Sequence, residues 1–198
     1  MQKDWTGNKA TPFAQLGVIY ATKQTNPERG LDYYATPPKA LEDLLQREKF
    51  ENVWDVADGE GHLCNVLKKY GILGKHSDIV NRGCGEVIDF LQYEGKWNGD
   101  IITNPPYRYA LQFVLKALEI IPEGRKVAML LRIQFLEGKQ RRKLLFNENP
   151  PARIYVWSDR ISCALNGRFD EIKHGSPIMF AWFVWEKGFK GYPVVKWF

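Results

Sequence analysis

The sequence predicts an α/β fold built on a mostly parallel β-sheet. Short apolar runs typical of buried strands alternate with segments in which apolar residues recur at helical spacing. Such alternation is typical of parallel strands joined by right-handed crossovers. The last two apolar runs, 153–157 and 178–185, have no helical pattern between them. We therefore expect the final strand to run antiparallel to the others.

The individual elements can be predicted in chain order. Residues 1–30 are polar and interrupted by Gly and Pro, which indicates an irregular arm, and residues 31–198 form a single domain. Thr36 is expected to cap a helix with Pro37 in its first turn. The remaining helices are predicted at 63–70, 110–121 and 137–146, and the strands at 52–56, 72–77, 87–90, 100–103, 126–133, 153–157 and 178–185.

Composition narrows the class of protein. The formal net charge of +5 favours an acidic partner but is equally compatible with plain solubility. Cys64, Cys84 and Cys163 form an odd, unpatterned set, which is typical of reduced thiols in a cytoplasm. The longest apolar run, 178–185, is too short to span a bilayer. The three histidines match no metal-binding spacing, so we expect no metal.

Asn104-Pro105-Pro106-Tyr107 is the most informative motif in the chain. It follows a short apolar run, and its two prolines can neither extend a sheet ladder nor continue a helix. The Asn104 side-chain oxygen and the Pro105 carbonyl can each accept one N–H, and Tyr107 can stack on an attached ring. Accepting both N–H groups of a heteroaromatic amine would stabilise the positive charge that grows as the amine attacks an electrophile.

A glycine turn follows the first predicted strand, in the run Asp55-Val56-Ala57-Asp58-Gly59-Glu60-Gly61. It lacks the third glycine of a dinucleotide fingerprint and the Lys of a phosphate loop, which indicates a nucleoside-like ligand without a diphosphate. Asp78 should end the second strand and bind ribose hydroxyls, while Asp89 should accept from an adenine amine beside Phe90. The carboxyl ends of parallel strands would bring these side chains together.

These residues resemble the N6-adenine DNA methyltransferases that use S-adenosylmethionine (AdoMet), especially the small phage and prophage enzymes. The similarity runs from about Asp32 to the C-terminus and includes the segments 32–38, 55–61, 104–107, 135–139 and 183–188. The resemblance implies a Rossmann-like, seven-stranded sheet whose last strand is antiparallel. It also implies methyl transfer from AdoMet to the N6 amine of an adenine that leaves the DNA stack, with S-adenosylhomocysteine (AdoHcy) as product.

The resemblance assigns roles to particular residues. Asn104, Pro105, Pro106 and Tyr107 would form the catalytic pocket, with Asn104 also at the cofactor. Tyr34 and Thr36 would hold the methionine part of AdoMet. Asp55, Ala57, Gly59 and Gly61 would line its amino-acid portion, Asp78 its ribose, and Asp89 with Phe90 its adenine. Asp58 departs from the family pattern, because relatives often have a small or neutral residue at this place.

Nucleic-acid contacts are expected from two basic segments. Lys139, Arg141 and Arg142 lie in a dense positive run that suits phosphates, although an exposed helix end would look the same. Arg160, Asn166 and Arg168 lie in a Gly-containing loop where relatives of the fold contact their target. No sizeable recognition domain fits after the catalytic core, so a short or relaxed target site is expected.

Several alternatives remain open. The same tetrapeptide occurs in RNA adenine methyltransferases and in enzymes that methylate a glutamine amide of a protein. A non-catalytic nucleic-acid-binding domain that keeps the fold is a third possibility, supported by Asp58 alone. The expected partner is DNA, with no membrane partner, the simplest oligomeric state is a monomer, and the expected location is the cytoplasm of a bacterium or of a phage-infected cell.

Overall fold

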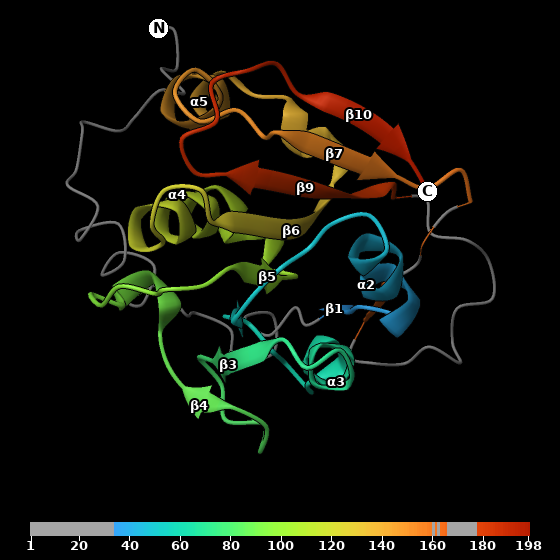
Figure 1. Cartoon of the computed structure of the whole chain (residues 1–198), viewed down its shortest axis with the longest axis vertical. Helices are drawn as coiled ribbons and strands as arrows, with labels where there is room; N and C mark the ends of the chain where they lie inside the picture. The colour runs from blue at the N-terminus through green and yellow to red at the C-terminus, as the bar shows by residue number, and fades with distance from the viewer. Residues whose placement is uncertain (1–33, 160, 162, 166–177) are drawn as a thin grey trace, which may run out of the picture. The chain divides into compact units, whose positions relative to one another are not determined.

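The computed structural model describes residues 34–159, 161, 163–165 and 178–198, all within the unit Asp32–Phe198. Eight strands form one sheet in the order β10-β7-β9-β6-β5-β2-β3-β4 (Figure 1). They are β2 (Val53–Asp55), β3 (Leu73–Asp78), β4 (Glu86–Val87), β5 (Ile101–Thr103), β6 (Lys126–Arg132), β7 (Arg153–Val156), β9 (Phe180–Glu186) and β10 (Val194–Trp197). Only β9 is antiparallel to its neighbours, β6 and β7, which confirms the expected mostly parallel sheet.

Helices cover both faces of this sheet. They are α2 (Pro38–Leu45), α3 (His62–Lys69), α4 (Ala110–Ile120) and the single turn α5 (Lys139–Arg141), which runs into the π-helical η4 (Arg142–Phe146). Three short 3₁₀ turns complete the set: η1 (Phe90–Gln92), η2 (Tyr107–Tyr109) and η3 (Ile133–Leu136). In Figure 1, α2 and α3 lie next to each other, and α4 lies apart from them, near β6.

Alternation along the strands divides the core into two layers. In β6, Val127, Met129 and Leu131 pack in the cluster that contains the buried side of α4, whereas Ala128 and Leu130 pack in the cluster that contains α2 and α3. Successive side chains of a strand point to opposite faces, so a sheet covered on both sides needs uninterrupted apolar strands. This explains why β6 and β9 read as continuous apolar runs.

The structure departs from the sequence-based expectations in five places. The C-terminal residues form an eighth strand, β10, parallel to β7, where seven strands were expected, and β1 (Tyr34–Ala35) pairs with β8 (Ala164–Leu165) in a small second sheet. Residues 88–90 leave the expected third strand, because Asp89 caps η1. The helix expected at 137–146 begins at Lys139 and changes to π-helical hydrogen bonding. Pro37 occupies the N-cap position of α2, where no side chain caps the helix.

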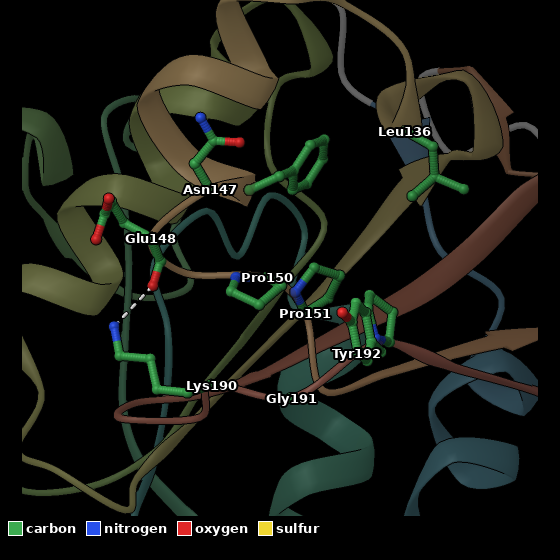
Figure 2. Close-up of a pocket in the computed structure, with 10 residues that line it drawn as sticks. Leu136, Asn147, Glu148, Pro150, Pro151, Lys190, Gly191 and Tyr192 are labelled. Atoms are coloured by element: carbon green, nitrogen blue, oxygen red, sulfur yellow. Dashed lines mark hydrogen bonds between the residues drawn. The ribbon is translucent and has the colours of Figure 1, made fainter.

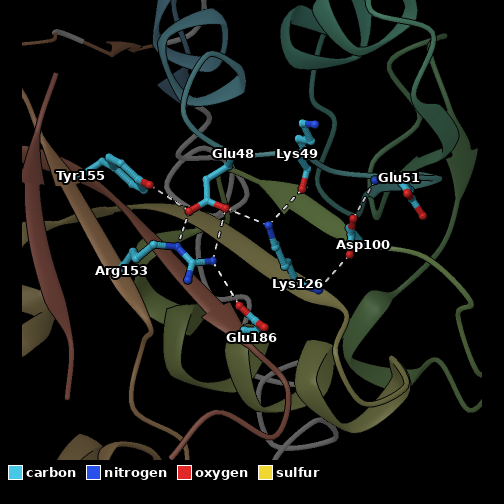
Figure 3. Close-up of polar contacts among 8 residues, drawn as sticks. All are labelled: Glu48, Lys49, Glu51, Asp100, Lys126, Arg153, Tyr155 and Glu186. Atoms are coloured by element: carbon cyan, nitrogen blue, oxygen red, sulfur yellow. Dashed lines mark hydrogen bonds and ion pairs between the residues drawn. The ribbon is translucent and has the colours of Figure 1, made fainter. Parts of the chain in front are cut away.

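A buried ionic network lies at the end of the sheet where the parallel strands β6 and β7 begin. The carboxylate of Glu48 accepts hydrogen bonds from Lys126 Nζ over 2.8 Å, from the hydroxyl of Tyr155 over 2.8 Å, and from the guanidinium of Arg153 (Figure 3). Burial alone would raise the pKa of Glu48, but these partners outweigh it and hold that pKa below its usual value. The network ties the chain after α2 to β6 and β7, at the opposite edge from the candidate site.

No helix among the described residues is both long and apolar enough to cross a bilayer. The predicted arm at 1–30 lies outside the described residues, so the domain division stays a prediction.

Candidate functional site

The candidate site lies at the carboxyl ends of β2 and β5, which are neighbours in the sheet. β2 ends at Asp55, and β5 ends at Thr103, directly before the Asn-Pro-Pro-Tyr motif. Asn104 and Asp55 line one small cavity of about 20 Å³, together with Thr36, Ala57, Asp58, His62 and Leu63. The fold therefore brings the prolyl motif and the glycine turn to one place, as the sequence predicts.

The Asn104 side chain is held in a defined orientation. Its Nδ2 donates over 2.9 Å to Oγ1 of Thr36, which lies in the loop before α2. In this orientation the amide oxygen, Oδ1, is the acceptor end of the side chain, and it is buried. Thr36 was expected to cap α2, and this was wrong, because its hydroxyl serves Asn104 instead. The contact was not predicted from the sequence, since no local pattern relates two segments so far apart in the chain.

The Tyr107 ring is packed at the start of η2. The guanidinium carbon of Arg132, at the end of β6, lies 5.0 Å from the centre of the ring, which is cation–π range. The Phe180 ring lies 5.5 Å away with a tilt of 32°. Burial raises the pKa of Tyr107 well above its usual value, so the phenol is neutral at physiological pH. Tyr107 thus acts as a flat, uncharged group.

The glycine turn uses left-handed backbone at Gly59 (φ 57°) and Gly61 (φ 78°), a conformation that favours glycine. Asp55 is fully buried beneath this turn, where the Cys64 thiol donates to its Oδ2 over 3.6 Å. Burial raises the pKa of Asp55 to about 7, and the nearby negative charge of Asp58 adds to the shift. Asp55 therefore titrates near neutrality.

Asp58 is also buried, with 5% of the residue exposed. Its Oδ2 lies 2.7 Å from His76 Nδ1, in β3. Asp58 thus does not face solvent, which leaves its charge inside the turn that the resemblance assigns to the cofactor. His76 could not be predicted as the partner of Asp58, because β3 reaches the turn only through the fold.

The other two predicted acids lie at the same side of the sheet but are engaged locally. Asp78, at the end of β3, accepts from the backbone N–H groups of Gly59 and Val80 over 3.0 and 2.8 Å, and from Arg82 Nη1 over 3.0 Å. Asp89 accepts from the N–H of Leu91 and is exposed. Phe90, in contrast, is buried in the core, with its ring 5.7 Å from that of Trp54.

The predicted nucleic-acid residues divide into two groups. Lys139 and Arg142 are exposed, whereas Arg141 folds back: its guanidinium donates to the carbonyls of Glu137 and Gln134 and lies 5.1 Å from the Phe135 ring. Arg141 therefore stabilises its own turn. The structure does not describe Arg160, Asn166 or Arg168, nor the side chain of Tyr34, so these predictions remain as they stand.

A larger cavity of about 450 Å³ lies elsewhere, between η4, the start of β7 and the turn before β10 (Figure 2). Pro150, Pro151, Phe146 and Tyr192 line it, and Lys190 Nζ donates to the carbonyl of Glu148 at its rim. None of its lining residues belongs to the prolyl motif or to the glycine turn. Size alone does not make it the functional site, because its lining is mostly apolar and prolyl, with one acid, Glu148, and one amide, Asn147.

Comparison with solved structures identifies the fold. A proposed RNA methyltransferase from Pyrococcus horikoshii matches with a TM-score of 0.57 and 19% identity, over 90% of this chain and 99% of that one. A proposed class I AdoMet-dependent methyltransferase from Listeria monocytogenes matches with a TM-score of 0.53 and 12% identity, over 92% and 71%. The chain has the Rossmann-like fold of the AdoMet-dependent methyltransferases. A predicted O-methyltransferase from Agrobacterium tumefaciens shares the methyltransferase fold with a TM-score of 0.51 and 11% identity, over 73% and 77%. No protein-family model and no curated protein matches the sequence.

The types of side chain and backbone at the site suit AdoMet. Carboxylates and left-handed glycines at the carboxyl edge of a methyltransferase sheet suit a cationic nucleoside-like ligand. The cavity of about 20 Å³ is much smaller than the roughly 300 Å³ or more of typical ligand pockets. A bound AdoMet would therefore require the groups that line this cavity to move apart.

Proposed function

We propose that this chain is an AdoMet-dependent methyltransferase that methylates the exocyclic N6 amine of adenine in DNA. One observation carries the proposal: the amide of Asn104 lines the same cavity as Asp55 and Ala57 of the glycine turn. Methyl transfer requires the substrate amine and the methyl donor to be held close together. A group that accepts from the amine, beside a turn suited to a nucleoside, would meet this requirement.

The residues of the motif supply acceptors, not a base. The Asn104 Nδ2 atom is directed at Thr36 Oγ1, so its Oδ1 can accept one N–H of a substrate amine. The Pro105 carbonyl can accept the second. AdoMet supplies a methyl group on a sulfonium, and transfer leaves a neutral thioether. Two acceptors on the amine would stabilise the positive charge that develops on its nitrogen, and the surplus proton would then pass to water.

Tyr107 would provide the stacking surface for the target base. A base amine inside a duplex is out of reach, so the adenine must leave the stack. In this structure the guanidinium of Arg132 lies over the Tyr107 ring. A flat base would take the place of this flat cation, which could then move toward a phosphate. Exposed Lys139 and Arg142 would add nonspecific phosphate contacts.

A methylation assay with labelled AdoMet tests the substrate. The full chain is incubated with duplex DNA, with RNA and with a protein extract, and the modified nucleoside or amino acid is then identified. The proposal predicts N6-methyladenine in DNA and none when Asn104→Ala replaces the wild type. Label confined to RNA adenine, or to a protein glutamine amide, would keep the chemistry and overturn the DNA assignment.

Calorimetry of AdoMet binding tests the alternative of a non-catalytic nucleic-acid-binding domain. The buried Asp58 carboxylate in the cavity wall is the observation that favours this alternative, because it places a negative charge near the cofactor's own carboxylate. Measurable binding of AdoMet supports the enzyme. No binding at millimolar AdoMet, with DNA binding retained, would establish the alternative.

A further inference from the structure

Three potential metal ligands from three different elements converge beside the glycine turn. They are Asp58 in the turn after β2, Cys64 in α3 and His76 in β3, and their ligand atoms all lie within 4.8 Å of one another. Asp58 and Cys64 are buried, and His76 is partly exposed, so a cation would reach the cluster past His76. No metal was predicted from the sequence because that prediction used only the spacing of residues along the chain. Asp58, Cys64 and His76 are brought together by the packing of β2, α3 and β3.

We propose that Asp58, Cys64 and His76 bind a Zn²⁺ ion. A carboxylate oxygen, an imidazole nitrogen and a thiolate are each established zinc ligands, with bond lengths of about 2.0–2.3 Å. Tetrahedral geometry at these lengths places ligand atoms about 3.5 Å apart, so a pair separated by 4.8 Å would close by about 1 Å, and Asp58 Oδ2 and His76 Nδ1, now 2.7 Å apart, would move slightly apart. Three protein ligands would leave one position for water or for another donor.

The charges around the cluster favour a cation. The Cys64 thiol donates to the carboxylate of Asp55 over 3.6 Å, and the Asp58 carboxylate belongs to the same cluster, so two acids lie beside this sulfur. His76 already contacts Asp58, and Arg82 pairs with Asp78 beside the same turn. A divalent cation would replace the thiol proton, which passes to water, and would offset both carboxylates.

At Gly85 the space beside the cluster admits only glycine. A Cβ on Gly85 would lie 2.3 Å from Asp58 Oδ2 and 2.6 Å from the carbonyl oxygen of His76, both too close to be tolerated. A Cβ on Gly61 would lie 3.5 Å from the sulfur of Cys84, which brings a second thiol to the same turn. The Cys84 sulfur is not among the ligand atoms that lie within 4.8 Å of one another, so the fourth position is assigned to water.

The proposed zinc site does not depend on methyl transfer, and binding can be measured directly. The full chain is treated with a chelator under reducing conditions, and Zn²⁺ is titrated in competition with a chromophoric chelator. We expect one equivalent to bind, with affinity reduced at least tenfold by Cys64→Ser and by His76→Gln. Cys163→Ser and His62→Gln are matched controls from outside the cluster and should bind as the wild type does. Co²⁺ should give a sulfur-to-metal charge-transfer band that Cys64→Ser removes.

Thermal unfolding guards against a variant that merely fails to fold. Because a ligand that binds only the native state raises Tm, Zn²⁺ should raise the Tm of the wild type and of the two controls but not that of His76→Gln, whose replaced side chain is partly exposed. Zn²⁺ affinity that is the same in the wild type and in both cluster variants, or a wild type that binds no Zn²⁺, would overturn the proposal.

Discussion

Asn104 and Thr36 are 68 residues apart in sequence, and Nδ2 of the first donates to Oγ1 of the second over 2.9 Å. In this contact the Nδ2 end of the amide donates and the threonine hydroxyl oxygen accepts. Thr36 is buried, and it precedes α2 without capping it. The hydroxyl is therefore a positioning group for the candidate catalytic amide.

Thr36→Val should test this positioning role. Valine keeps the shape of threonine but removes the acceptor, so the amide loses its fixed orientation. We expect kcat to fall on the order of tenfold, with little change in KM for AdoMet, since orientation counts most in the transition state. Steady-state kinetics on DNA would measure this, and Thr36→Ser should restore most of kcat. Unchanged kcat in Thr36→Val would show that the hydroxyl does not orient Asn104.

Tyr107 variants should separate the ring from the hydroxyl. Tyr107→Phe keeps the flat surface beneath Arg132 and should retain most of the activity, whereas Tyr107→Ala should lose on the order of 10²-fold in kcat/KM. The reason is that stacking on a base contributes about 1–3 kcal/mol. Fluorescence of 2-aminopurine placed at the target adenine would report extrusion of the base. Equal losses in both variants would mean that the hydroxyl, not the ring, is required.

Glu48 should matter for stability and not for chemistry. Replacing it with Gln leaves Lys126 without its anionic partner and Arg153 with Glu186 alone, at a buried position, which typically costs about 3 kcal/mol or more. Urea denaturation would measure the loss. Glu51→Gln is the matched control, since its ion pair with Arg125 is exposed and such pairs contribute about 1 kcal/mol or less. Similar losses of unfolding free energy in the two variants would show that the buried Glu48 network stabilises the fold no more than an exposed ion pair does.

The same network predicts an acid limit to stability. The pKa of Glu48 is lower in the folded chain than in the unfolded chain, so its contribution is present above its unfolded pKa and is lost as pH falls through the folded value. The difference in unfolding free energy between the wild type and Glu48→Gln should therefore shrink below about pH 4.5. A difference that stays constant into acid would contradict the lowered pKa.

Asp55 should give the opposite pH dependence. Its pKa is raised to about 7 in the folded chain, so the folded state holds more protons than the unfolded state between about pH 4 and pH 7. Stability from this group is greatest at low pH and is lost as pH rises toward 7. The wild type should therefore gain stability relative to Asp55→Asn when pH is lowered from 8 to 5. Denaturation curves for both proteins at the two pH values would show whether the difference changes.

The order of strands and helices could be predicted because apolar runs and helical spacing are visible within short stretches of the sequence. The continuous apolar runs of β6 and β9 and the helical stripe of α4 lie where the sequence places them, within a residue or two. β10 was missed because Val194–Trp197 is a four-residue segment whose side chains are all exposed, so no apolar alternation marks it. Pairing with β7 creates that strand, and a partner so far away leaves no local signal.

The candidate site was predictable only in outline. Prolines after β5 and glycines after β2 predict the positions of their turns, and neighbouring parallel strands bring them together. The partners of the site residues depend on contacts between distant segments: Thr36 with Asn104, His76 with Asp58, and Arg132 with Tyr107. Phe90 shows the limit most clearly, because an aromatic residue after an acid suits both an adenine wall and the core, where it lies.

The most direct test of the account is Asn104→Ala, assayed in parallel for AdoMet binding by calorimetry and for methyl transfer to DNA. If Asn104 accepts an N–H of the substrate amine, turnover should fall on the order of 10²-fold or more, while the Kd for AdoMet stays within about threefold of the wild-type value. Full turnover in the variant, or a loss of AdoMet binding as large as the loss of turnover, would contradict the role that the structure supports for this residue.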